Sequence, residues 1–170
     1  MARGAPLIRR VEPGDAQLVK TIRLRSLQAD PLSFGSTYER EAAFDDAAWE
    51  DWARDDAHGD EMATFLAVEA STPLGIVGAY RDDDEPGLYH VVAMWVAPEV
   101  RRRGLARRLL EEIEGWIVAA GGTEVQLFVT DAAEAAQSLY RSTGYAPDGA
   151  TMPSRHSPGL LETSLRKSLK

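Results

Sequence analysis

Cysteine is absent from the 170-residue sequence, and long apolar runs are absent as well. Without cysteine the chain has no disulfide framework, no thiolate metal site and no cysteine nucleophile, which agrees with a reducing compartment. No apolar run approaches the roughly 20 residues of a membrane-spanning helix, and the first residues lack the apolar segment of a signal peptide. We therefore expect a cytoplasmic protein that binds no membrane.

Common catalytic and metal-binding motifs are also missing. The sequence has no phosphate-binding loop, no dinucleotide fingerprint, no zinc-protease motif and no serine-hydrolase elbow. Its three histidines, His58, His90 and His156, are far apart and lack the spacing of metal ligands. These absences argue against a metal-dependent hydrolase or a nucleoside-triphosphate enzyme, and we expect no bound metal.

The charge balance is acidic, with 27 Asp and Glu residues against 19 Lys and Arg residues and a formal net charge of −8. This balance argues against nucleic-acid binding by the chain as a whole. The hydrophobic share of 44% and the charged share of 27% are ordinary for a globular protein. The length suffices for one hydrophobic core and is short for two, so we expect residues 1–170 to form one domain.

Hydrophobic periodicity predicts alternating strands and helices. The expected strands are 7–11, 63–69, 74–81, 88–96, 125–129 and 160–165. Four helices are expected. The first spans 16–29, the second starts at a cap formed by Asp45 or Asp46, and the third spans 104–119. The fourth starts at a capping box of Asp131 and Glu134 and ends at about residue 142. The order β-α-α-β-β-β-α-β-α-β predicts an α/β (α+β) fold with a single sheet and helices on both faces.

An arginine cluster opens the helix at 104–119. Residues 101–108 contain five arginines in an otherwise acidic chain, and they directly follow a strand. Free N–H groups and the macrodipole make a helix N-terminus attractive to anions. The small residues Gly104 and Ala106 would let a phosphate approach the main chain, so the segment predicts a pyrophosphate site. The alternative is a solvated helix start, with Arg107 and Arg108 paired to Glu111 and Glu112.

Two segments carry a family resemblance. Residues 96–106 (VAPEVRRRGLA) resemble the [QR]-x-x-G-x-[GA] motif of the GNAT superfamily of N-acetyltransferases, and residues 136–145 (AQSLYRSTGY) resemble its second signature, A-x-x-L-Y-x-x-x-G-[FY]. Both motifs, in order and separated by a helix and a strand, are a specific combination. The resemblance implies a GNAT-like central mixed sheet and transfer of an acetyl group from acetyl-CoA to a primary amine by direct attack.

The resemblance also implies which residues hold acetyl-CoA. Amides of the motif loop would bind the pyrophosphate, and the end of the preceding strand would pair with the pantetheine arm. A bulge in that strand would leave an N–H free to polarise the thioester carbonyl. The implied cofactor-binding residues are Met94, Trp95, Val96, Arg101, Arg102, Arg103, Gly104, Leu105, Ala106 and Arg107.

Tyr140 occupies the position of the family's usual general acid, which protonates the departing thiolate. The family often has Asn seven residues earlier, where this chain has Ala133, so one polar contact to the cofactor is missing or comes from elsewhere, with Thr130 and Asp131 as candidates. For the general base, His90 and Glu69 are both candidates. Members of the family are often dimers, so the resemblance also implies a homodimer.

Other interpretations remain open at the level of sequence. A binding-only module of the same fold would hold acyl-CoA without turnover; Ala133 favours that alternative and Tyr140 argues against it. A nucleic-acid protein would need the basic stripe to continue, but Glu111, Glu112 and Glu114 interrupt it.

The sequence does not assign the acceptor. Acidic stretches at 39–61 and 82–85 would favour a cationic acceptor if they border the cleft, or else form a solvated surface. The aromatic residues Phe34, Tyr38, Trp49 and Trp52 fit either an acceptor pocket or the core.

Overall fold

The computed structural model describes residues 4–170, which build one seven-stranded mixed sheet. The strands lie in the order β1-β2-β3-β4-β5-β7-β6, and all neighbours are antiparallel except the parallel pair β4 and β5. Their bounds are β1 Leu7–Arg10, β2 Met62–Glu69, β3 Thr72–Arg81, β4 Leu88–Val96, β5 Glu124–Thr130, β6 Ala146–Pro153 and β7 Leu161–Ser168.

Helices connect the strands. They are α1 Ala16–Ala29, α2 Tyr38–Ala42, α3 Asp46–Asp56, α4 Leu105–Ala119 and α5 Glu134–Ser142, with short 3-10 turns at Pro13–Asp15, Pro31–Ser33 and Pro98–Val100. None of the helices within residues 4–170 is both long enough and apolar enough to cross a membrane.

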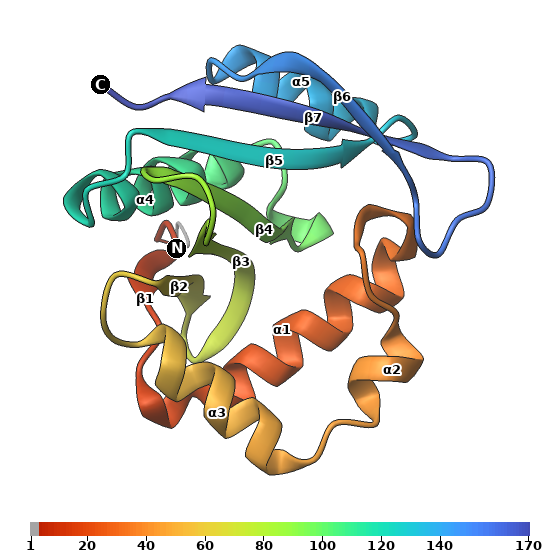
Figure 1. The fold of residues 1–170 in the computed structure, drawn as a ribbon. Coiled ribbons are helices and arrows are strands. Elements are labelled where there is room, and N and C mark those ends of the chain that lie inside the picture. Colours follow the sequence, from red (N-terminus) through yellow and green to blue (C-terminus); the bar gives the residue numbers. More distant parts are fainter. Residues whose placement is uncertain (1–3) are drawn as a thin grey trace.

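The helices cover the two faces of the sheet unequally (Figure 1). On one face α3 docks at the β1–β3 end through Trp52, whose indole N–H donates to Thr64 of β2 (3.1 Å). On the other face α4 packs its apolar side on the sheet, with Leu109, Ile113 and Ile117 fully buried. Tyr145, which follows α5, donates to Glu114 of α4, so α5 shares the α4 face. The sheet therefore separates two layers of helices.

Strands β4 and β5 pair only where they begin. The parallel register runs from Leu88–Glu124 to His90–Gln126 and then stops, although β4 continues to Val96 and β5 to Thr130. Beyond this point the two strands diverge and leave main-chain groups of β4 without a partner strand. This divergence positions the functional site.

The predicted fold class is confirmed, and the structure adds two elements to the predicted order. Helix α2 has only five residues, which is too short to show a helical period, and the Thr37 hydroxyl caps it by accepting from the Arg40 N–H. Strand β6 lies in a segment for which the sequence predicted no strand. Its two prolines are tolerated because β6 is an edge strand that pairs with β7 alone.

The predicted helix caps are confirmed at α3 and wrong at α5. The Asp45 carboxylate accepts from the Ala48 N–H (2.9 Å) as expected. Helix α5, however, begins after Ala133 with no side-chain cap, and the Asp131 carboxylate accepts from Thr163 of β7 instead (2.9 Å). A strand neighbour that is distant in the sequence thus competes successfully with the local cap.

Candidate active site

The divergence of β4 and β5 opens a cavity of about 1030 Å³. Its walls come from the end of α1 and the turn that follows, the end of β4, the loop and first turn of α4, the end of β5, and α5. A volume of this order accommodates a large organic ligand. The arginine cluster and Tyr140, which are 30 or more residues apart in sequence, both reach this cavity.

Strand β4 is bulged beside the cavity. Gly78 of β3 faces Val92 and Ile76 faces Trp95, so two residues of β4 oppose one residue of β3 between these pairs. Ala93, within the bulge, has a φ of +56°. An alanine in this left-handed region is strained, and such strain is often found at functional sites.

The open edge of β4 presents main-chain groups to the cavity. The Ala97 N–H donates to the Leu74 carbonyl of β3 (2.8 Å). Because backbone groups alternate between the two edges of a strand, Trp95 also faces β3. Met94 and Val96 therefore direct their N–H and C=O groups toward the gap, and the Met94 N–H lies next to the bulge.

The loop before α4 turns its amides outward. Arg102 has a φ of +63° and Gly104, the N-cap of α4, a φ of +76°. A Cβ at Gly104 would meet no atom within 4 Å, so the position favours glycine because of its backbone conformation rather than for lack of room. The first N–H groups of α4 have no intrahelical acceptor and, with the macrodipole, make this corner of the cavity attractive to anions.

The arginines of this loop have different environments. Arg102 and Arg107 line the cavity, and Arg107 also donates to the Ser142 hydroxyl of α5 (3.1 Å). Arg108 turns away and donates to the Pro6 carbonyl, and Arg103 is not part of the lining. Within residues 4–170, Arg107 and Arg108 form no ion pairs with the glutamates one turn later. Of the three arginines that line the cavity, Arg101 is paired with Asp30, and the guanidinium groups of Arg102 and Arg107 have no carboxylate partner among residues 4–170.

Asp30, at the end of α1, connects the two halves of the cavity wall. Its carboxylate accepts from the indole N–H of Trp95 (2.6 Å) and from the Arg101 guanidinium (2.8 Å). Arg101 also donates to the Val96 carbonyl (2.8 Å) and lies over the Trp95 ring. The Arg101 side chain therefore braces the loop against α1 and β4. Sequence analysis missed Asp30, because 65 residues separate it from Trp95.

Tyr140 lies on α5 and lines the cavity. Its ring packs against Tyr145, with ring centroids 5.7 Å apart. Burial raises the pKa of the Tyr140 phenol, so its proton is retained at neutral pH. Tyr145 instead donates to Glu114 of α4 (2.8 Å). Of these two phenols, only Tyr140 is among the residues that line the cavity.

His90 lies earlier on β4 and outside the cavity lining. Its Nε2 is 2.6 Å from the Asp82 carboxylate, and its ring stacks on Tyr80 with centroids 4.9 Å apart. The bond from His90 and two backbone N–H groups, from Asp84 and Glu85, lower the pKa of Asp82 to about 2. In the tautomer that carries its proton on Nε2 and donates it to this carboxylate, Nδ1 is the acceptor nitrogen of the ring.

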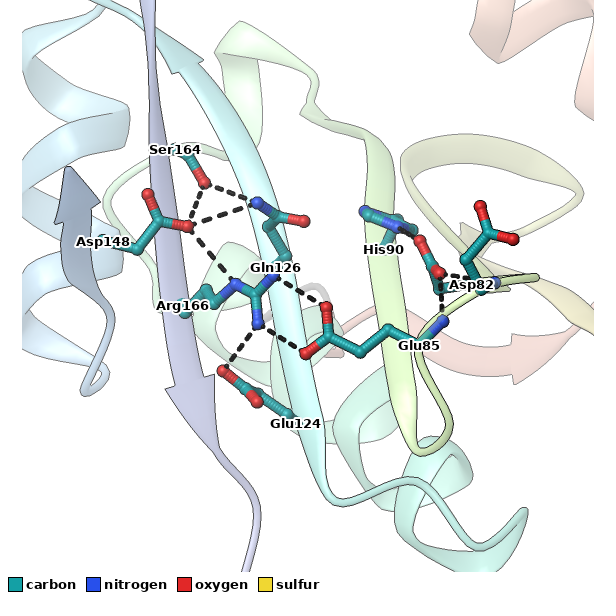
Figure 2. A network of polar contacts seen from close by, with 9 residues as sticks. Asp82, Glu85, His90, Glu124, Gln126, Asp148, Ser164 and Arg166 are labelled. Carbon is teal, nitrogen blue, oxygen red and sulfur yellow. Dashed lines mark hydrogen bonds and ion pairs between the residues drawn. The ribbon is translucent and has the colours of Figure 1, made fainter. Parts of the chain in front are cut away.

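A polar network extends from this pair across the neighbouring strands (Figure 2). Gln126 of β5 donates to Ser164 of β7 (2.7 Å), and Ser164 donates to Asp148 of β6 (2.7 Å). Arg166 of β7 binds three carboxylates, those of Glu85, Glu124 and Asp148. The network fixes this end of the sheet face and holds the loop after β3 near β7.

The structure brings together most of the residues singled out in the sequence. The cavity lining contains Met94, Trp95, Val96, Arg101, Arg102, Gly104, Leu105, Ala106, Arg107 and Tyr140, and also Thr130 and Ala133. Arg103, His90 and Glu69 are outside it, and Glu69 ends β2 at the hairpin with β3. Within residues 4–170 no three His, Asp or Glu side chains cluster as metal ligands would.

The early aromatic residues lie mainly in the core. Trp49 is 1% exposed and stacks on Trp52. Phe34 is buried under the guanidinium of Arg23, which forms a bidentate ion pair with Glu41 of α2 (2.8 and 2.9 Å). These side chains fasten α1, α2 and α3 to one another.

Known proteins share the sequence motifs and the fold. The sequence model of the acetyltransferase (GNAT) family matches residues 22–145. The match includes Tyr140 and the arginine-rich segment 101–108, which we call the arginine loop. The chain belongs to the GNAT acetyltransferase family. A protein described as an IAA acetyltransferase from Azospirillum brasilense is 35% identical over 106 residues, which cover 62% of this chain and 67% of that protein.

Solved structures of GNAT acetyltransferases superpose on nearly the whole chain. A member from Streptococcus pneumoniae is 25% identical with a TM-score of 0.81, covering 96% of this chain and 99% of that one. A putative acetyltransferase from Salmonella typhimurium, solved with its cofactor acetyl-CoA, is 16% identical with a TM-score of 0.79, covering 98% of this chain and 95% of that one. The second likeness concerns the fold alone.

Proposed function

We propose that this GNAT acetyltransferase transfers the acetyl group of acetyl-CoA to a primary amine by direct attack. The observation that carries the proposal is the bulge of β4 at the open edge of the cavity, next to the arginine loop. A free N–H beside the bulge and an anion-binding corner fit the two polar parts of a thioester donor, its carbonyl and its pyrophosphate.

The residues present fit acetyl-CoA along the whole cavity. The amides from Arg102 to Arg107 would bind the pyrophosphate, with the Arg102 and Arg107 guanidinium groups at hand. The Met94 C=O and the Val96 N–H would pair with the pantetheine amides, since the Val96 C=O already accepts from Arg101. Ala133 supplies no polar group to the cavity, whereas the nearby Thr130 does. Bound acetyl-CoA supplies the electrophilic carbonyl carbon.

Three groups of this chain serve the chemistry. The Met94 N–H stabilises the negative charge that develops on the carbonyl oxygen when the amine nitrogen bonds to the carbonyl carbon. His90, oriented by Asp82, takes the proton released by the attacking nitrogen, through water because it lies outside the cavity lining. The carbon–sulfur bond then breaks, and the Tyr140 phenol donates a proton to the departing sulfur.

Calorimetric titration with acetyl-CoA tests the donor site, with desulfo-CoA and ATP as controls. Micromolar binding of acetyl-CoA and little binding of ATP are expected. Thiol release with an amine panel then tests turnover. Binding without thiol release for any amine would favour the binding-only module. If acetyl-CoA does not bind at moderate salt, the proposed donor site is wrong, and the chain shares only the fold of its family. A His90→Gln variant should lower kcat while acetyl-CoA affinity by calorimetry stays near the original.

A further inference from the structure

Three large apolar side chains on one face of the sheet are uncovered. Tyr80 is 44% exposed, Val92 42% and Phe128 40%. They belong to the neighbouring strands β3, β4 and β5. We call these three residues the apolar floor. An exposed cluster of large apolar residues on a soluble protein commonly marks a binding surface.

The strand register places the three residues on the same face. Gly78 pairs with Val92 and Tyr80 with His90 across β3 and β4, and cross-strand partners point to the same side. His90 is level with Gln126 on β5, and Phe128 follows two residues later. Thr64, which pairs with Gly78 and binds Trp52, identifies this face as the one that α3 partly covers.

The apolar floor is continuous with the proposed reaction centre. Phe128 lines the cavity, as does Met94, whose N–H lies beside the bulge. Val92 is the last residue before the bulge. A molecule resting on the floor therefore has one end at the point where the donor carbonyl would lie. The other end of the floor is Tyr80, which stacks on His90.

Charges around the floor favour a cation and oppose an anion. In the network of Figure 2 the carboxylates of Asp82, Glu85, Glu124 and Asp148 outnumber the one guanidinium, that of Arg166. Asp82 stays ionised because its pKa is lowered to about 2. Arg166 is fully engaged with three carboxylates. Arg155 also acts on Tyr80, but the carboxylates of Asp82 and Asp83 outnumber it there, so the charge around the floor is negative on balance.

We propose that the acceptor is a primary amine with a flat apolar body and no carboxylate, seated on Tyr80, Val92 and Phe128. This rests on the proposed N-acetyl transfer. The apolar body loses water-exposed area against the floor, and the amino group lies at the end of the floor beside the bulge. An acceptor that also carries a carboxylate would place that group where carboxylates outnumber guanidinium groups, which costs affinity.

Three amines test separately the flat apolar body and the absence of a carboxylate in the acceptor. 2-Phenylethylamine has the flat body and the amine, n-butylamine lacks the ring, and phenylalanine adds only the carboxylate. We expect kcat/KM for 2-phenylethylamine to exceed that of each of the other two at least about tenfold, as one apolar or charge mismatch typically produces. Equal or reversed values for either comparison amine would overturn the proposal.

A pair of variants assigns the preference to the floor. Val92→Ser removes apolar contact and should reduce the ratio of kcat/KM for 2-phenylethylamine over n-butylamine about tenfold. The matched control is Val118→Ser, at a valine of α4 that is 52% exposed on the opposite face; it should leave the ratio unchanged. An unchanged ratio in Val92→Ser, or the same loss in Val118→Ser, would overturn the assignment.

Calorimetry with acetyl-CoA on the same preparations distinguishes failure of the acceptor proposal from failure of the proposed function. If acetyl-CoA binds and another amine is preferred, the acceptor proposal alone is wrong. If acetyl-CoA binds and no amine of either panel reacts, the acceptor proposal and the proposed transfer are both wrong, and the binding-only module is favoured. If acetyl-CoA does not bind, the proposed function is wrong and the acceptor proposal falls with it.

Discussion

The bulge at Ala93 offers the sharpest test of the proposed mechanism. Ala93 has a φ of +56°, and an L-residue in this region carries roughly 1–2 kcal/mol of strain. A β-branched side chain raises that cost further, because its second γ-substituent crowds the backbone at positive φ. We expect Ala93→Val to destabilise the native strand by roughly 1–3 kcal/mol.

This strain has a consequence for catalysis. The strand can relieve it by straightening the bulge, and a one-residue change of register reverses the direction of every following side chain and amide. The Met94 N–H would then leave the open edge. Loss of one such donor lowers kcat by roughly 100-fold to 1000-fold in enzymes of acyl transfer. Ala93→Gly should keep kcat near the original, because glycine adopts positive φ freely.

Ala70 provides the matched control. It lies in the β2–β3 hairpin with a φ of +46°, and it is not among the residues that line the cavity. Urea denaturation of Ala70→Val and Ala93→Val should show losses of similar size, whereas thiol-release assays should show a large loss of kcat for Ala93→Val alone. Full kcat in a folded Ala93→Val protein would refute the role of the bulge.

Three further predictions concern titratable groups. Tyr140→Phe should lower kcat roughly 100-fold with acetyl-CoA affinity nearly unchanged by calorimetry, and an unchanged kcat would remove Tyr140 from the mechanism. Burial raises the pKa of the Asp56 carboxyl, so the folded state holds its proton more tightly and the unfolding free energy falls as pH rises above about 4. Asp56→Asn should therefore increase the unfolding free energy more at pH 7 than at pH 3. An equal change at the two pH values would contradict this reasoning. Glu41→Gln leaves the buried Arg23 guanidinium without its counter-charge and should cost about 3–5 kcal/mol in urea denaturation, with most of the loss recovered when Arg23→Met is added.

The regular elements were predictable because their signals are local. Helix α1 and strand β4 have the predicted bounds, and α4 lies within the predicted range 104–119 with Leu105, Leu109 and Ile113 buried. Each of these segments has a hydrophobic period long enough to distinguish a helix from a strand. Strand β6 lacked this signal, because its prolines, its glycine and its exposed side chains are typical of a loop.

The arginine loop and Tyr140 were also found in the sequence, because both lie within short motifs whose residues are adjacent in the chain. Their convergence on one cavity was an expectation from the family resemblance, and the structure places both in its lining. Arg103 was included with its neighbours, but the path of the loop excludes it from the lining.

What the sequence determined by itself is the set of elements and the chemistry of short segments, since periodicity and motifs depend on neighbours along the chain. Tertiary structure alone decided the partners. It joined Asp82 to His90, brought Asp30 to Trp95 and Arg101, and exposed Tyr80, Val92 and Phe128 together. Strand register and the divergence of β4 from β5 set these contacts, and both depend on packing between residues that are distant in the sequence.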